Sequence, residues 1–170
     1  MPQKRTATYR QAPKKKKRTS DTFRPKRAQK RLVPASSRIL ENGTIEMVVP
    51  LITISEANTY EHWTKSAARH KKQKGIIKLY WMQLRNMVPP LPIKMQLIRL
   101  APRKLDFVNL CMSMKWIEDS ICEELTGNYV PGRADGDPRI KTSFSQEKSK
   151  EYGVKIIFEP EGNHEQIRTC

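Results

Sequence analysis

Two hydrophobic patterns follow one another between residues 93 and 125, and they restrict the fold more than any other feature of the chain. Residues 93–100 (Ile-Lys-Met-Gln-Leu-Ile-Arg-Leu) alternate between apolar and polar side chains, which is typical of a strand with one buried face. After a break at Pro102, apolar residues recur every three or four positions, as on one face of a helix: Leu110, Met114, Ile117, Ile121 and Leu125. We therefore expect a helix that packs on a sheet, and a strand that leads directly to Asp106.

The flanking segments predict the remaining strands and a second helix. Residues 44–51 are rich in β-branched side chains and follow an Asn42-Gly43 turn, so they predict a strand. Residues 60–86 have helical periodicity and end at the proline-rich run 88–92. Residues 139–145 and 154–159 are further candidate strands. The expected fold class is α/β (α+β), a small mixed β-sheet with two main helices in the order β-α-β-α-β-β.

The positive charge is concentrated at the N-terminal end of the chain. Residues 1–38 hold 14 Lys or Arg against one acid, so this stretch carries +13 of the formal net charge of +16. It has few large apolar side chains with which to offset its ordering entropy. We therefore expect a disordered basic tail over residues 1–42, a folded domain over 43–160 and a flexible C-terminus over 161–170.

Such a tail attracts polyanions, of which nucleic acid is the simplest. An acidic membrane surface or ribosomal RNA would attract it as well, and the run Lys14, Lys15, Lys16, Lys17 and Arg18 also fits a nuclear import signal. As DNA-binding residues, these five would add affinity through phosphate contacts without reading the sequence.

A second group of basic residues lies on the predicted first helix and just before the second. Its members are Lys65, Arg69, Lys71, Lys72, Lys74, Arg103 and Lys104. The helical ones either face the DNA backbone or form an ordinary solvated face. His62 and His70 have no acid or Cys at metal-ligand spacing, so neither is predicted to bind a metal.

The cysteines indicate a reducing compartment, and the apolar runs are too short for a membrane span. Cys111, Cys122 and Cys170 form no CxxC pair and are odd in number, so neither a disulfide framework nor structural zinc is expected. No apolar run approaches the ~18 residues of a membrane span, and no signal peptide is apparent. We expect an intracellular protein without a membrane partner.

Acidic residues gather around the predicted second helix, in an otherwise basic chain. Lys115 and Asp119 are four residues apart and therefore neighbours on that helix, where an ordinary surface salt bridge is the alternative to a functional pair. The turn-rich loop 127–138 adds Asp135 and Asp137, which either shape the turns or contribute to a site. Asp106 or Asn109 is a candidate N-cap.

In order and spacing, these segments resemble the RusA-like Holliday-junction resolvases, and within them the phage-type branch. The resemblance covers about residues 44–160. It rests on the "SEANTYEHWTKSAARHKKQKG" helix, the "LDFVNL" block followed by Lys115 and Asp119, the "ADGDPRI" loop and the closing "SQEKSKEYGVKIIFEP".

The resemblance implies a Mg²⁺-dependent endonuclease, a hydrolase of DNA recombination and DNA repair that acts as a homodimer on branched or four-way DNA. Mn²⁺ is a possible substitute for Mg²⁺. The implied catalytic residues are Asp106, Lys115, Asp119 and Asp137, and the implied metal ligands are Asp106, Asp119, Asp135 and Asp137, with Asp135 and Asp137 as alternatives for the last ligand. Asn109 would contact a carboxylate or DNA phosphate, or cap the helix. The implied location is the cytoplasm, at the nucleoid of a bacterial or phage-infected cell.

Position 108 departs from the family pattern, because Val108 stands where the family has its second aspartate. Loss of a carboxylate there would weaken Mg²⁺ binding. Val108 therefore favours one alternative, a catalytically degenerate RusA-like DNA-binding protein. A separate alternative is a small basic RNA- or ribosome-associated protein whose aspartates only shape turns.

Overall fold

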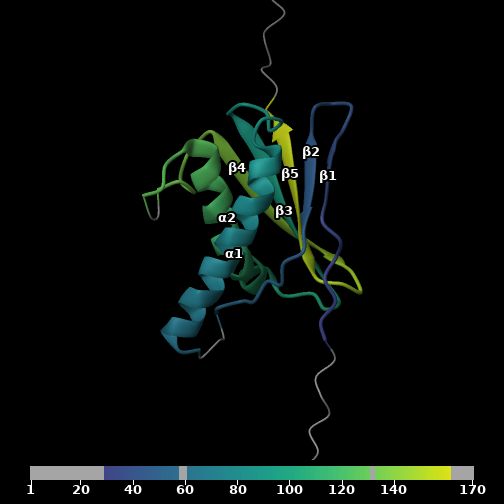
Figure 1. Ribbon diagram of the computed structural model, residues 1–170, viewed down its shortest axis with the longest axis vertical. Coiled ribbons are helices and arrows are strands. Elements are labelled where there is room, and N and C mark those ends of the chain that lie inside the picture. Colours follow the sequence, from purple (N-terminus) through teal and green to yellow (C-terminus); the bar gives the residue numbers. More distant parts are fainter. Residues whose placement is uncertain (1–28, 58–60, 131–132, 162–170) are drawn as a thin grey trace, which may run out of the picture.

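The computed structural model describes residues 29–57, 61–130 and 133–161 of the chain (Figure 1). A five-stranded mixed sheet and two helices form a small α+β domain, so the expected fold class is confirmed. The elements follow in the order β1 (Ser36–Ile39), β2 (Ile45–Val49), α1 (Trp63–Leu84), β3 (Ile93–Ala101), α2 (Phe107–Thr126), β4 (Ile140–Lys148) and β5 (Gly153–Pro160).

The sheet has the strand order β1-β2-β5-β3-β4, and only β3 and β4 run parallel. A parallel pair needs a crossover connection, and α2 provides it. Both helices lie on the same side of the sheet (Figure 1). There they cover alternate strand residues that are fully buried, among them Ile45, Met47, Ile93, Met95 and Leu97.

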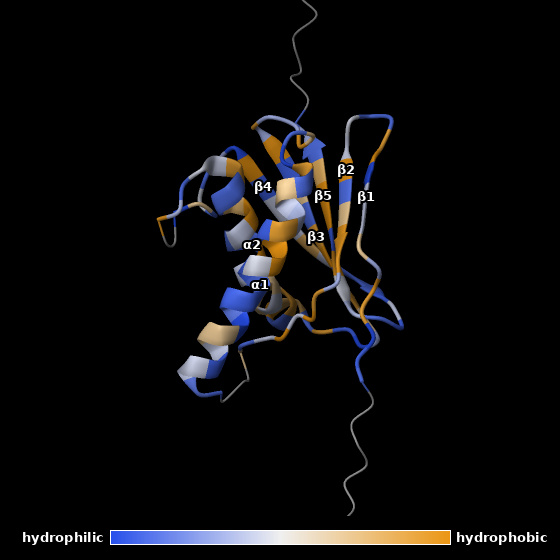
Figure 2. Cartoon of the chain, in the orientation of Figure 1, coloured by the Kyte–Doolittle hydropathy of each residue, from blue (hydrophilic) through white to orange (hydrophobic). Residues whose placement is uncertain are grey.

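The two helices meet this core with different parts of their length. The predicted apolar stripe of α2 is buried at Leu110, Met114, Ile117 and Ile121. In α1 the first buried residue is Gln73, and the apolar contacts come later, at Ile77, Trp81 and Leu84. The earlier turns of α1 extend past the end of the sheet and are mostly hydrophilic (Figure 2). The basic half of α1 is therefore the half that the sheet leaves uncovered.

The expected boundary of the tail at residue 42 is wrong, because β1 lies inside it. Ser36–Ile39 pairs antiparallel with β2 across a tight turn in which Gly43 adopts a positive φ of 77°. All four β1 residues are exposed, so no buried pattern marks the strand and its backbone pairing holds it. Residues 1–28, with Lys14–Arg18, and residues 162–170 lie outside the described part of the chain.

In the described ranges, no helix is long and apolar enough to cross a membrane.

Candidate functional site

Lys115 lies at the centre of a group of carboxylates on α2 and the loop that follows it. Its Nζ is 2.9 Å from Oδ1 of Asp119 and 3.7 Å from Oε2 of Glu118, and it forms an ion pair with Oδ2 of Asp135. We call these four residues the Lys115 cluster. The structure thus brings together three of the predicted site residues, one of them from a loop 20 residues further along the chain.

The carboxylates of the Lys115 cluster differ in their electrostatic environment. Burial raises the pKa of Glu118, although Lys115 opposes this effect. Burial also raises the pKa of Asp119, and the nearby charge of Asp135 adds to the shift. By contrast, the hydrogen bond from Lys115 lowers the pKa of Asp135. Three carboxylates share one ammonium, so the Lys115 cluster has a surplus of negative charge in a basic protein.

Lys115 itself stays charged in this environment. Burial lowers its pKa, but the bonds to Asp135 and Asp119 outweigh burial and raise it. The adjacent Cys122 is buried in the core, where desolvation and then the charge of Glu118 raise the pKa of its thiol to about 12. The thiol therefore keeps its proton at neutral pH and does not serve as a nucleophile.

Asp106 lies apart from the Lys115 cluster, at the start of α2. It is the N-cap residue: its Oδ1 accepts the backbone N–H of Asn109 at 2.9 Å, and its Oδ2 accepts the Asn109 amide at 2.6 Å. These bonds lower the pKa of Asp106. Nine residues separate Asp106 from Lys115, which is about 13 Å along a helix axis. The amide oxygen of Asn109 accepts a hydrogen bond from Ser55.

The two loop aspartates have different partners. Asp135 contacts Lys115, whereas Asp137 forms an ion pair with Arg139 at 2.7 Å and also accepts the Arg139 backbone N–H. The bonds from Arg139 lower the pKa of Asp137 to about 2. Of these two alternatives for the last acidic residue of the site, Asp135 is therefore the one beside Lys115 and Asp119.

The Lys115 cluster suits a hard divalent cation by donor type but not by arrangement. Carboxylate oxygens are the ligands that Mg²⁺ prefers. Here, however, they converge on the ammonium of Lys115. Over residues 29–57, 61–130 and 133–161, no three His, Cys, Asp or Glu side chains gather in a way that could hold a metal ion.

The predicted DNA-binding residues of the domain fall into two groups. Lys65, Lys71 and Lys72 are exposed on α1, and Arg103 and Lys104 are exposed just before α2. Two others have acidic partners: Lys74 forms an ion pair with Glu123, and Arg69 lies between Glu56 and Glu61. Arg69 thus has a structural role that its sequence position did not indicate.

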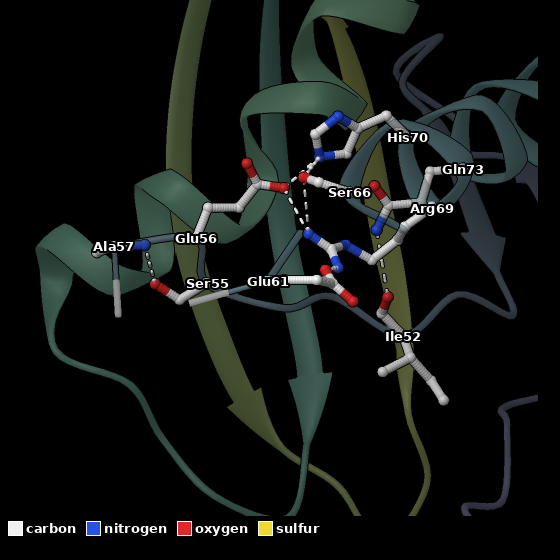
Figure 3. Close-up of polar contacts among 9 residues, drawn as sticks. All are labelled: Ile52, Ser55, Glu56, Ala57, Glu61, Ser66, Arg69, His70 and Gln73. Carbon is white, nitrogen blue, oxygen red and sulfur yellow. Dashed lines mark hydrogen bonds and ion pairs between the residues drawn. The ribbon is translucent and has the colours of Figure 1, made fainter. Parts of the chain in front are cut away.

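Arg69 belongs to a polar network that the sequence did not predict (Figure 3). Oε1 of Glu56 is 2.9 Å from Nη2 of Arg69 and also contacts Nε2 of His70. Ser66 Oγ approaches the same His70 nitrogen at 3.4 Å. Ser66 and Glu56 both contact Nε2 of His70. These three residues therefore do not form a proton relay, which needs both nitrogens of the imidazole.

The network extends to α2 through an aromatic contact. The His70 ring stacks on the Trp116 ring, with a centroid distance of 3.9 Å and an interplanar angle of 22°. Gln73 of α1 donates a hydrogen bond to the Ile52 carbonyl at 3.3 Å, in the segment before α1 that also carries Glu56. The spacing of Ser66 and His70 on α1 was visible in the sequence. Glu56 and Trp116 had no local signal, because they meet His70 only when two elements are placed side by side.

No protein-family model and no curated protein sequence matches the chain. The resemblance to the RusA-like resolvases therefore stays a prediction.

Proposed function

We propose that the protein is a structure-specific DNA endonuclease that acts on branched DNA, with Mg²⁺ or Mn²⁺ as the expected cofactor. The observation that carries the proposal is the meeting of Lys115 and Asp119 on α2 with Asp135 of the following loop. These contacts put a charged lysine at the centre of an acidic group. The RusA-like resemblance implies that the helix lysine, the aspartate four residues later and a loop aspartate are site residues, and these are the three residues that meet here.

In this proposal Lys115 acts on the scissile phosphate. Its ammonium would stabilise the negative charge that develops on the phosphorus oxygens in the transition state. Asp119 and Asp135 hold the ammonium from two sides, so its position is set before DNA binds.

The basic residues would position the DNA. Lys65, Lys71 and Lys72 on the uncovered half of α1 are suited to contacts with backbone phosphates, which set orientation but not sequence preference. The RusA-like resemblance implies a homodimer, in which two sites would cut opposed strands of a four-way junction.

The test is cleavage of a synthetic four-way junction in Mg²⁺. The expected result is paired nicking near the branch point, lost in Lys115→Ala and retained in Lys94→Ala, which removes an exposed lysine from β3. Asp106→Asn separates two roles, because Asn also caps helices. If Asp106 only caps α2, this variant still cuts; if its carboxylate is needed, cutting stops while the fold remains.

A second candidate is DNA binding without cleavage, and position 108 favours it. Val108 is 66% exposed on the first turn of α2, where the family pattern has an aspartate. Tight binding of the junction without product in Mg²⁺ or Mn²⁺ would support this candidate. A gain of cutting in Val108→Asp would show that one missing carboxylate is the cause. Equal affinity for junction and linear duplex at ~150 mM salt would instead favour the RNA- or ribosome-associated alternative.

A further inference from the structure

β4 forms one edge of the sheet and is much longer than the strand at the other edge. It spans nine residues, Ile140–Lys148, whereas β1 at the opposite edge spans four (Figure 1). Residues 142–146 (Thr-Ser-Phe-Ser-Gln) carry no charge and include no proline. Shortness, charges and prolines are features that keep an edge strand from pairing with another chain. The middle of β4 lacks all three.

The backbone groups of every second residue of β4 point away from the sheet. The Ile93 N–H donates to the Arg139 carbonyl, and the Ser149 N–H donates to the Ala101 carbonyl. In a parallel ladder, these bonds mean that the odd-numbered residues of β4 direct their backbone groups toward β3. The outward residues in the middle of the strand are Thr142, Phe144 and Gln146. Their N–H and C=O groups form no hydrogen bond with the described part of the chain, so this edge can pair with a further strand.

The sequence of β4 is complementary to itself when two copies run antiparallel about Phe144. In that register Phe144 lies opposite its own copy, and Lys141 lies opposite Glu147 of the second copy. The remaining pairs in the middle of the strand are Thr142 with Gln146 and Ser143 with Ser145. Opposite charges, hydroxyl pairs and aromatic pairs directly across an antiparallel ladder stabilise it. A shift by two residues in either direction removes both Lys–Glu pairs.

The charges of Lys141 and Glu147 are accessible to a second copy. Lys141 forms an ion pair with Glu161, and Glu147 with Lys155, yet the side chains of Lys141 and Glu147 remain 61% and 51% exposed. Exposed ion pairs of this kind contribute little to stability, so they can be exchanged for others. Charges that only protect an edge need no particular sign. Opposite signs at equal distances from the centre of β4 matter only when two copies pair.

We propose that two copies of the chain associate through β4, antiparallel about Phe144, so that the two sheets become one. The N–H groups of Thr142, Phe144 and Gln146 in each copy would then find carbonyl acceptors in the other. The pairing is inferred from β4 alone. What it does for the site rests on the proposed function and deepens it, because it defines how two sites meet on one junction.

This pairing would bring the two Lys115 clusters close together. Glu118 of the Lys115 cluster has a hydrogen bond with Thr142, which is two residues from the central Phe144. At ~3.4 Å per residue, the two Thr142 residues would lie about 14 Å apart along the strand direction. A two-fold axis perpendicular to the sheet keeps the helices of both copies on the same face. Two sites near one axis and on one face are suited to opposed strands of a four-way junction.

The experiment measures the association of the full-length protein by analytical ultracentrifugation, without DNA or divalent cation. The expected result is a dimer. Lys141→Glu and Glu147→Lys should each weaken it by about tenfold, since two like-charge pairs replace two opposite-charge pairs. The double variant should recover the affinity of the wild-type protein. A mixture of the two single variants should form mixed dimers, because one chain then brings two acids and the other two bases. Lys65→Glu is the control, since it reverses an exposed charge on α1 and should leave association intact.

A protein that stays monomeric up to ~100 μM would overturn the inference. A dimer that ignores the single reversals, or one that neither the double variant nor the mixture restores, would overturn it as well. These outcomes are separate from failure of the proposed function. A β4 dimer that neither prefers nor cuts four-way junctions contradicts only the proposed function, whereas junction cutting by a protein without this dimer contradicts only the inference.

Discussion

Glu118 is a buried carboxylate on α2, with 9% of its surface exposed, and it lies at the inner side of the Lys115 cluster. Lys115 is 3.7 Å away and Thr142 of β4 contributes a hydrogen bond. Neither partner fully offsets the loss of hydration, since burial still raises the pKa of Glu118. The ionised form of this side chain is therefore a cost to the folded state at neutral pH.

We predict that Glu118→Gln is more stable than the wild-type protein at pH 7 and equally stable near pH 4. The pKa of Glu118 is raised in the folded state, so its contribution to stability is fully present below the unfolded pKa of about 4.5 and is lost as the pH rises through the folded pKa. Glutamine does not ionise and avoids this loss. Urea unfolding at several pH values between 4 and 7 measures the difference.

Glu159→Gln is the matched control for this prediction, because Glu159 is exposed near the end of β5. It should change the stability little across the same pH range. A Glu118→Gln variant that is equally destabilised at pH 4 and pH 7 would contradict the electrostatic account. It would show instead that the hydrogen bond with Thr142 decides the effect.

At the residue scale, the sequence predicted what depends on local geometry. The spacing of four residues places Asp119 beside Lys115, and Asp106 was one of two candidate caps for α2. The role of Glu118 was not predictable in this way, because its burial depends on how α2 lies against β4. The same reason explains why the stacking of His70 on Trp116 was missed.

At the scale of elements, the chain before β1 is bonded to the connection between β4 and β5, at Tyr152. The Val33 N–H donates to the Tyr152 carbonyl at 2.9 Å, and the Tyr152 N–H donates to the Arg31 carbonyl at 2.9 Å. These bonds join residues 31–33 to the start of β5. The sequence predicted no order here, because the segment is basic and its pairing uses the backbone groups of Tyr152, about 120 residues further along the chain.

The close approach of this segment depends on Gly153, the first residue of β5. A Cβ at this position would collide with Cγ2 of Val33 and lie 3.1 Å from the carbonyl oxygen of Val49. We predict that Gly153→Ala lowers the free energy of unfolding by about 1–3 kcal/mol, the usual range for overpacking. Chemical denaturation measures the change.

Val33→Ala provides the companion variant for this test. It removes the methyl group that the new Cβ would meet, so the double variant should recover part of the lost stability. Gly75→Ala is the control, because a Cβ at Gly75 meets no atom within 4 Å and the position lies inside α1. If Val33→Ala gives no recovery, the contact with Val49 limits the packing instead.

At the scale of the whole molecule, opposite charges are separated along the chain. The Lys115 cluster lies on α2 and the loop that follows it, the exposed lysines lie on the half of α1 that the sheet leaves uncovered, and most of the net positive charge precedes residue 39. The sequence predicted this division and the fold class, since charge runs and hydrophobic periods are local properties. It placed the end of the tail wrongly, because β1 has no buried face.

The corrected boundary changes how the tail should be tested. Eleven of the 14 basic residues before position 39 lie within residues 1–28, ahead of every described contact with the sheet. We predict that deleting residues 1–28 weakens DNA binding and flattens its dependence on salt, while cutting in Mg²⁺ persists at saturating protein. Each lost phosphate contact lowers the slope of log K against log salt by about 0.9, so eleven charges can account for at most about ten.

Deleting residues 1–38 serves as the comparison, because it also removes the bonds at residues 31–33 and most of β1. This longer deletion should lower stability in urea unfolding, whereas the shorter one should not. Binding isotherms at several salt concentrations separate the two effects. If the shorter deletion abolishes cutting at saturating protein, the tail belongs to the active complex and is more than an electrostatic aid to binding. If it leaves the salt slope unchanged, the DNA contacts lie on the folded domain, with the exposed lysines of α1 as the first candidates.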